Sequence, residues 1–221
     1  MKDIILHDIL IPSLKRLYQE DYNNIKYGVS ERNICARLAH HMENIMREYD
    51  AKNRTSFFTS YNADVEYNRM GNGDLKCYED NQKRPRYMVS DLLIQSRGYE
   101  GNLLAVELKK KGSAKKGIEE DKKRLMSMVT PGALSQLTGC VHDTLLSAFI
   151  IYSKDGVDMD VFEFSSEDGK VISRKYSLRC LFCEYDETMI ETIEICDETR
   201  CRLIDLDKPF VPRLTNKDKE N

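Results

Sequence analysis

Apolar residues recur at helical spacing in two segments near the start of the chain. Within the first 28 residues they predict a helix that is interrupted or begins near Pro12. A second, longer helix is predicted from the N-cap Ser30 to about residue 49. Glu31 lies seven residues before Leu38, so it shares the inward face of this helix. Such an acid is explained either by attraction to the helix N-terminus or by a functional role.

Alternating or continuous apolar runs predict strands farther along the chain. These runs cover residues 62–68, 87–95, 102–109, 145–152, 160–164 and 170–176. The polar, glycine-containing stretches 70–86 and 112–117 are typical of loops. Helical spacing returns over 118–129 and 131–143. The run 145–152 is almost wholly apolar, which is typical of a strand buried on both faces.

This order of elements predicts an α/β fold with a mixed central β-sheet flanked by helices. A chain of 221 residues is long enough for one sizeable core and short for two independent domains. We interpret residues 1–28 as an N-terminal helical segment and 29–176 as the core. Residues 177–214 are interpreted as a cysteine-containing extension of the same domain, and 215–221 as a disordered tail.

The composition excludes two broad classes of protein. With 41 % hydrophobic and 32 % charged residues, the chain is typical of a globular protein rather than a disordered one. Its longest apolar run is far too short to cross a bilayer. The apolar N-terminal segment contains Asp3, His7 and Asp8, unlike a secretory signal. We therefore expect a cytoplasmic protein with no membrane partner.

The predicted strand 102–109 carries the main chemical signal. Alternation along it places Glu107 and Lys109 on one face, about 7 Å apart at the backbone, and leaves leucine and valine side chains for the other. The preceding strand carries Asp91 within a similarly apolar run. If the two strands pair as a hairpin, Asp91 comes close to Glu107.

Two carboxylates beside a lysine suit the hydrolysis of a phosphodiester. Mg²⁺, or Mn²⁺ in its place, prefers oxygen ligands that include one or two carboxylates. The metal polarises the phosphate and lowers the pKa of a bound water. A lysine can orient or deprotonate that water, or stabilise the charge on phosphorus. The backbone carbonyl of Leu108, between the two functional side chains, is a further candidate ligand.

A solvated ion pair is the alternative interpretation of Glu107 and Lys109, because Glu-x-Lys is a common strand pattern. Asp91, with 15 residues between it and Glu107, favours the catalytic interpretation.

The spacing of Asp91, Glu107 and Lys109 resembles the signature of the PD-(D/E)XK, or restriction-endonuclease-like, nuclease superfamily. Further segments are similar to an uncharacterised bacterial group within it: 29–32, 37–40, 64–69, 97–98, 102–104, and Asp121 with Lys122 and Leu125. The resemblance spans about residues 30–152. The family's proline before the aspartate is absent, since Ser90 stands there, but the triad is intact.

The resemblance implies a core in the order α-β-β-β-α-β. It implies a metal held by Asp91 and Glu107, with the first-helix acid Glu31 completing the site, and it places Lys109 at the family's lysine. Gln136 matches a position where relatives sometimes carry a polar active-site residue, and we expect it to contact the nucleic acid.

A cluster of lysines directly follows this motif. Lys110, Lys111, Lys115 and Lys116 fall with Lys109 within eight positions. The net charge of −3 argues against binding through overall charge but permits a local patch. Lysine runs are usually solvated loops. The position of this one suits contacts with the phosphates of DNA, with RNA not excluded.

The cysteines raise a separate question. Seven cysteines, an odd number, do not suit a disulfide framework, so reduced thiols are expected. Cys180, Cys183, Cys196 and Cys201 have spacings that would also permit a structural zinc ion. Neither pair contains the glycine or proline that is usual in a zinc knuckle, which favours reduced thiols.

Two functional hypotheses follow. The first is a Mg²⁺-dependent nuclease acting on DNA, placed in defence or repair by family analogy. The second is a catalytically silent nucleic-acid-binding or protein-interaction module on the same fold, with residues 179–214 as its working part. Nucleases that cut both DNA strands often act as dimers, so a homodimer is kept as an alternative to a monomer.

Overall fold

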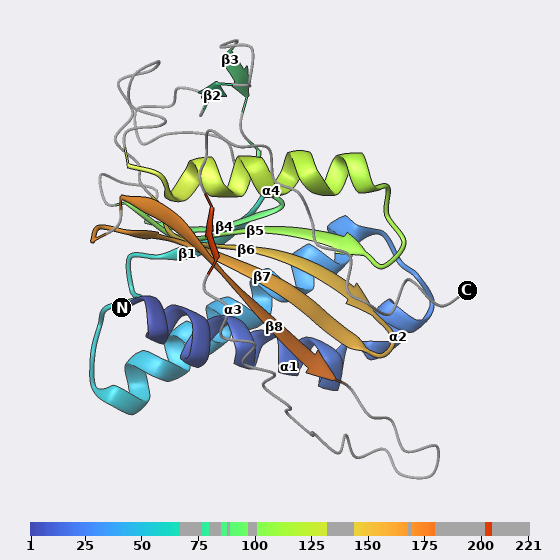
Figure 1. Cartoon of the computed structure of the whole chain (residues 1–221). Coiled ribbons are helices and arrows are strands. Elements are labelled where there is room, and N and C mark those ends of the chain that lie inside the picture. The colour runs from blue at the N-terminus through green and yellow to red at the C-terminus, as the bar shows by residue number, and fades with distance from the viewer. Residues whose placement is uncertain are drawn as a thin grey trace.

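The computed structural model describes residues 1–66, 89–96, 101–131, 144–167 and 169–179, and the backbone of short strands at 77–79, 85–87 and 202–204. A mixed seven-stranded sheet forms the centre, in the order β1-β4-β5-β6-β7-β8-β9. Helix α4 covers one face, and α1 and α3 cover the other (Figure 1). The expected α/β class, with a mixed sheet flanked by helices, is confirmed.

Two of the four N-terminal helical elements, α1 and α3, begin close to the predicted positions near Pro12 and after Ser30. The π-helix η1 (Ile4–Leu10) is followed by α1 (Ile11–Glu20), α2 (Tyr22–Lys26) and α3 (Glu31–Asn53). Pro12 lies where η1 passes without a break into α1, because Leu10 and Ile11 both have helical backbone angles and the Ile11 N–H donates to the Leu6 carbonyl. Its missing N–H leaves a gap in the helical hydrogen bonds at the change from π- to α-helix. Ser30 caps α3 as predicted, because its hydroxyl accepts a hydrogen bond from the Asn33 N–H at 3.3 Å.

Most neighbouring strands of the central sheet are antiparallel. Their bounds are β1 (Asn62–Val65), β4 (Leu92–Gln95), β5 (Asn102–Lys110), β6 (Thr144–Ser153), β7 (Gly156–Ser165), β8 (Lys170–Arg179) and β9 (Arg202–Ile204). The pair β5–β6 is parallel and is connected through α4 (Lys115–Val129). A parallel pair requires such a crossover, whereas the predicted hairpin of β4 and β5 is antiparallel, with Leu92 opposite Val106.

The strand predicted over 87–95 is wrong in its first half. Tyr87 ends β3 (Pro85–Tyr87), which pairs with β2 (Cys77–Glu79) inside the stretch expected as a loop. Pro85 is tolerated as the first residue of a strand. Asp91 therefore precedes β4 instead of lying within it. Its side chain accepts the Leu108 N–H at 2.8 Å and so replaces a backbone partner at that point of β5.

Helix α4 begins at Lys115, earlier than the predicted residue 118. Lys115 and Lys116 thus belong to its first turn, not to the expected loop. Two lysines there oppose the helix dipole slightly. The apolar face that includes Leu125 and Met128 packs on the sheet and outweighs this local preference.

Both faces of β5 are buried up to Leu108, which sets the environment of the candidate site. Leu104, Val106 and Leu108 pack into the core shared with α1 and α3, as the alternation predicted. Ala105 packs into the second core, beneath α4. Glu107 follows Ala105 on the α4 side and is held in the same buried layer.

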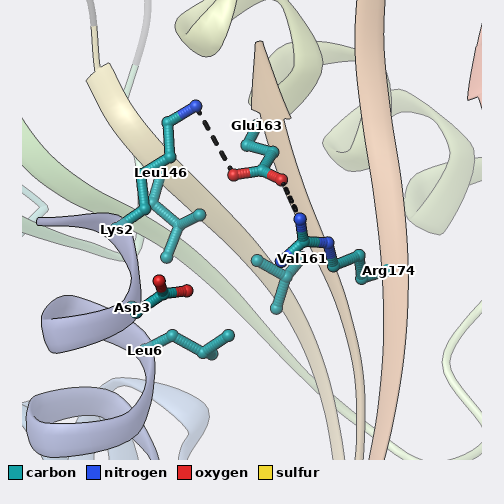
Figure 2. Close-up of a pocket in the computed structure, with 7 residues that line it drawn as sticks. All are labelled: Lys2, Asp3, Leu6, Leu146, Val161, Glu163 and Arg174. Carbon is teal, nitrogen blue, oxygen red and sulfur yellow. Dashed lines mark ion pairs between the residues drawn. The ribbon is translucent and has the colours of Figure 1, made fainter. Parts of the chain in front are cut away.

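The N-terminus is anchored to the sheet at a small hollow on the face opposite α4. The carboxylate of Glu163 lies between two cations: Lys2 Nζ is 3.4 Å from one oxygen and an Arg174 nitrogen is 2.7 Å from the other (Figure 2). Lys2 also donates to the carbonyl of Phe164 at 2.8 Å. These contacts hold η1 against the β7–β8 hairpin, far from Lys109 in the sheet.

Within the described ranges, no helix has the length and apolar character needed to cross a membrane. The predicted helix 131–143 lies outside the described residues beyond its first position, as does the tail 215–221.

Candidate active site

Charged side chains from four parts of the chain converge near the end of β5. They come from the first residue of α3, the residue before β4, β5 itself and the α4 face that packs on the sheet. In this order they are Glu31, Asp91, Glu107 with Lys109, and Asp121 with Arg124. The four residues predicted to be catalytic are therefore brought together, and two further residues join them.

Lys109 lies at the centre of three of these acids. Its Nζ is 3.7 Å from a Glu31 oxygen, 3.8 Å from an Asp91 oxygen and 3.6 Å from an Asp121 oxygen. These separations are longer than the 2.7–2.9 Å or so of a close charge-assisted hydrogen bond. One ammonium thus faces three carboxylates without contacting any of them tightly.

Backbone N–H groups of β5 orient two of the acids. Asp91 accepts from the Leu108 N–H at 2.8 Å, and Glu31 accepts from the Lys110 N–H at 3.0 Å. The N–H and carbonyl of one strand residue point to the same edge of the strand, so the Leu108 carbonyl faces the Asp91 side. Glu31 is thus directed at the end of β5 as well as standing at the start of α3.

Arg124 holds the remaining two acids. Its guanidinium contacts one Glu107 oxygen at 2.5 and 3.0 Å, and an Asp121 oxygen at 2.7 Å. Asp121 and Arg124 are three residues apart on α4, so both project from the same face of the helix. Glu107 is only 1 % exposed, and this cation supplies its charge-assisted hydrogen bonds.

Burial and the charges around the site change the pKa values of Glu107 and Lys109. Burial, reinforced by the nearby charge of Asp91, raises the pKa of Glu107 to about 8, although Arg124 works in the opposite direction. Burial alone would lower the pKa of Lys109. The charges of Asp91, Asp121, Glu31 and Glu107 outweigh burial, so the pKa of Lys109 rises above its ordinary value and the ammonium stays protonated.

The same acids affect two groups behind the site. Burial raises the pKa of the Cys35 thiol, and the charges of Asp91 and Glu31 add to the effect. Burial, with Glu31 and Cys35, raises the pKa of Tyr152 to about 12. Both groups therefore stay neutral near pH 7, and Cys35 is a packed thiol rather than a nucleophile.

The donor set suits a divalent cation by its chemistry. Four carboxyl groups face Lys109 and Arg124, and full ionisation leaves an excess of two negative charges among these six residues. Burial first, and then the charges of Asp91 and Asp121, raise the pKa of Glu107. As the side chains stand, no three His, Cys, Asp or Glu residues in the described ranges are spaced as a metal site. In place of a metal ion, Lys109 and Arg124 form ion pairs with these acids.

Searches of protein-family models, curated proteins and solved structures find no match to this chain.

Asp121 and Arg124 were missed as functional residues by the sequence reasoning, although Asp121 formed part of the resemblance. A signal was available. In the predicted helix 118–129, Asp121 falls on the apolar side with Ile118 and Leu125, and the structure buries it. A buried acid needs a cationic partner, and Arg124 follows at the helical spacing of three.

The other predicted residues fall in different places. Lys110, Lys111, Lys115 and Lys116 are exposed along the end of β5, the following turn and the start of α4. They therefore border the acid cluster on its solvent side. Gln136 and the cysteines Cys180, Cys183, Cys196 and Cys201 lie outside the described residues.

Proposed function

We propose that this protein is a Mg²⁺-dependent nuclease that hydrolyses phosphodiester bonds of DNA, with an active site of the PD-(D/E)XK type. The observation that carries the proposal is the position of Lys109. Its ammonium lies within 3.8 Å of Glu31, Asp91 and Asp121 at the end of a buried strand, with Glu107 beside them. A solvated surface ion pair would have neither the burial nor the three converging acids.

The order of elements supports the finer fold proposal. Omitting the β2–β3 hairpin, the chain runs α3, β1, β4, β5, α4, β6. This is the α-β-β-β-α-β succession that the resemblance implies, with the antiparallel pairs first and the parallel crossover last. We therefore propose a restriction-endonuclease-like core.

The roles of the residues follow from their contacts. Asp91 and Glu107, with Glu31 and the Leu108 carbonyl, would hold the cation, which when bound polarises the phosphodiester and acidifies the attacking water. The N–H groups of Leu108 and Lys110 keep Asp91 and Glu31 in place. Arg124 and Asp121 hold Glu107 from the helix side.

Lys109 has a narrower role than the motif alone allowed. The charges of its acidic neighbours raise the pKa of Lys109, which favours the protonated ammonium over a proton acceptor. We assign it to the stabilisation of negative charge on phosphorus and to orienting the nucleophile. An ammonium tethered on β5 is suited to both tasks, because the rigid strand fixes its origin.

The test of this function is cleavage of supercoiled plasmid and of single-stranded DNA with Mg²⁺ or Mn²⁺. We expect cutting by the wild type that stops on chelation and is slowed by about 100-fold or more in Glu107→Ala and Lys109→Ala at equal, folded concentration. Cutting that survives both substitutions would place the activity elsewhere or in a contaminant. Absence of cutting on every DNA and RNA substrate, with DNA binding retained, would favour the silent binding module.

The exposed lysines are expected to contribute a salt-dependent part of DNA binding. Lys115→Ala with Lys116→Ala should lower the slope of log K against log salt by about 2 on duplex DNA, since each lost phosphate contact removes about 0.9. Anisotropy titrations over a range of salt measure this slope. The matched control is Lys52→Ala with Lys170→Ala, which should leave the slope unchanged. Both lysines are exposed, Lys52 in the last turn of α3 and Lys170 at the start of β8. An equal loss in both pairs would indicate a nonspecific effect of charge.

We also propose a cellular location and a biological process for this activity from the resemblance. We place it in the cytoplasm, in defence against foreign DNA or in repair. In a homodimer, each of the two copies of the site would cut one strand of a duplex.

A further inference from the structure

An exposed aromatic side chain borders the proposed active site. Tyr27, directly after α2, has 74 % of its surface exposed and is the most exposed large hydrophobic residue in the described part of the chain. Aromatic rings are usually buried because of their large apolar area. Single exposed apolar residues are common on protein surfaces, so the surroundings of this ring decide what it can bind.

The end of α2 explains why the ring projects into solvent. Gly28 has φ +69°, a left-handed conformation that suits glycine, and its N–H donates to the Ile25 carbonyl at 3.2 Å. The Val29 N–H then donates to the Asn24 carbonyl at 3.0 Å, which closes the helix in the manner of a Schellman cap. The chain turns back toward α3 here, and Tyr27 stays at the outer edge of the turn.

Lysines surround this edge. Lys26 Nζ lies 5.6 Å from the centre of the Tyr27 ring, within the range of a cation–π contact. Lys110 comes from β5 to the same place, since a Cβ added to Gly28 would lie 3.2 Å from Lys110 Nζ. Lys110 directly follows Lys109 in sequence, so the ring and the acid cluster lie at one end of β5.

The neighbouring strand adds to the positive surface. The Lys111 N–H donates to the Tyr152 carbonyl at 2.9 Å, which places Lys111 beside the end of β6. Lys154 is exposed in the turn that follows β6. Figure 1 shows α2 next to the ends of β5 and β6, where the chain leaves for α4. An aromatic ring and lysines from three elements thus share one edge of the protein.

We propose that Tyr27 is a stacking platform for an unpaired base, and that single-stranded DNA enters the active site across it; this specifies the substrate of the proposed nuclease and rests on that function. The lysines hold the phosphates while the ring contacts a base. A positively charged track with an aromatic side chain is the combination by which proteins bind single strands. Bases inside a duplex are already stacked on one another, so an isolated ring has no face to contact there.

The absence of tryptophan from the sequence permits a direct test of stacking. Tyr27→Trp introduces a single tryptophan at this position. We expect its fluorescence to be quenched by a single strand of about 12 nucleotides, added in EDTA so that nothing is cleaved. The matching duplex should leave the fluorescence almost unchanged. Equal quenching by both forms, or by neither, would overturn the proposal.

Affinities measured by anisotropy in EDTA provide the second test. Tyr27→Ala should weaken single-strand binding by about 5-fold to 150-fold, the effect of losing one stacked base, while duplex binding changes by about twofold or less. Tyr27→Phe keeps the ring and should bind like the wild type. Phe57→Ala is the matched control, because Phe57 is an exposed aromatic residue (38 %) beyond the opposite end of α3.

The outcomes separate this inference from the proposed function. If the wild type cuts DNA in a metal-dependent manner but Tyr27→Ala binds single strands normally, the inference fails and the nuclease stands. If Tyr27→Ala loses single-strand affinity and the wild type cuts nothing with any metal, the stacking platform stands and the catalytic proposal fails.

Discussion

Lys109→Ala is expected to lower the rate of metal-dependent DNA cleavage by about 100-fold to 10,000-fold, the range for loss of one group that stabilises transition-state charge or handles a proton. The protein should still fold and still bind Mg²⁺. Lys109 is the one cation within 4 Å of Glu31 and Asp91 among the described ion pairs at the site. Its removal leaves those acids with more uncompensated negative charge, which favours a metal ion.

This combination of lost turnover and retained metal separates Lys109 from the acids. Asp91→Asn should lose both, because it removes the charge of a proposed ligand and alters the carboxylate that accepts the Leu108 N–H. Single-turnover cleavage measures the chemistry, and calorimetric titration with Mg²⁺ measures the binding. Lys52→Ala, a change of the same kind on a distant exposed residue, controls for the loss of one charge. Cleavage by Lys109→Ala within about tenfold of the wild type would exclude this lysine from the chemistry.

In EDTA, the free energy of unfolding is expected to fall as the pH rises from about 5 to about 8. The pKa of Glu107 is about 8 in the folded protein because of burial and Asp91, and it returns to the ordinary range of a glutamate, near 4, on unfolding. Between these values the folded protein holds a proton that the unfolded chain releases. Stability is therefore lost across this interval and levels off above it, by an amount on the order of 3–5 kcal/mol.

Glu107→Gln should remove most of this pH dependence, because glutamine fills the same space without a titrating proton. Urea denaturation at a series of pH values gives the free energy of unfolding for both proteins. Glu120→Gln, an exposed acid on the same helix as Arg124, is the matched control and should keep the slope of the wild type. Added Mg²⁺ should restore stability to the wild type at pH 8 and much less to Glu107→Gln. A wild-type profile that is flat from pH 5 to 8 would contradict the assigned environment of Glu107.

Part of the candidate site could be predicted because local patterns carry it. The period of two along β5 placed Glu107 and Lys109 on one face, and the structure agrees. Pairing of β4 with β5 brought Asp91 to this strand, as a hairpin requires. The N-cap Ser30 marked the start of α3 and so located Glu31 in its first turn.

Other features depended on neighbours that the local sequence does not specify. The two strands β2 and β3 stabilise each other across a polar stretch with weak strand propensity, so periodicity could not find them. Asp91 was placed inside a strand because its neighbours are apolar, but its carboxylate takes the Leu108 N–H and the strand begins after it. The start of α4 at Lys115 depends on packing beyond its first turn.

By itself the sequence determined the α/β class, the helix and strand that carry Glu31, Glu107 and Lys109, and the charge cluster that follows them. These depend on the periods of 3.6 and 2.0 and on capping, which act over a few residues. Only the tertiary structure decided that Arg124 holds Glu107, that Asp121 is a third acid around Lys109, and that Tyr27 lies beside Lys110. Each of these contacts joins residues from different helices and strands. Such contacts depend on how a helix crosses the sheet or ends against it. A pattern within one short segment carries no information about that packing.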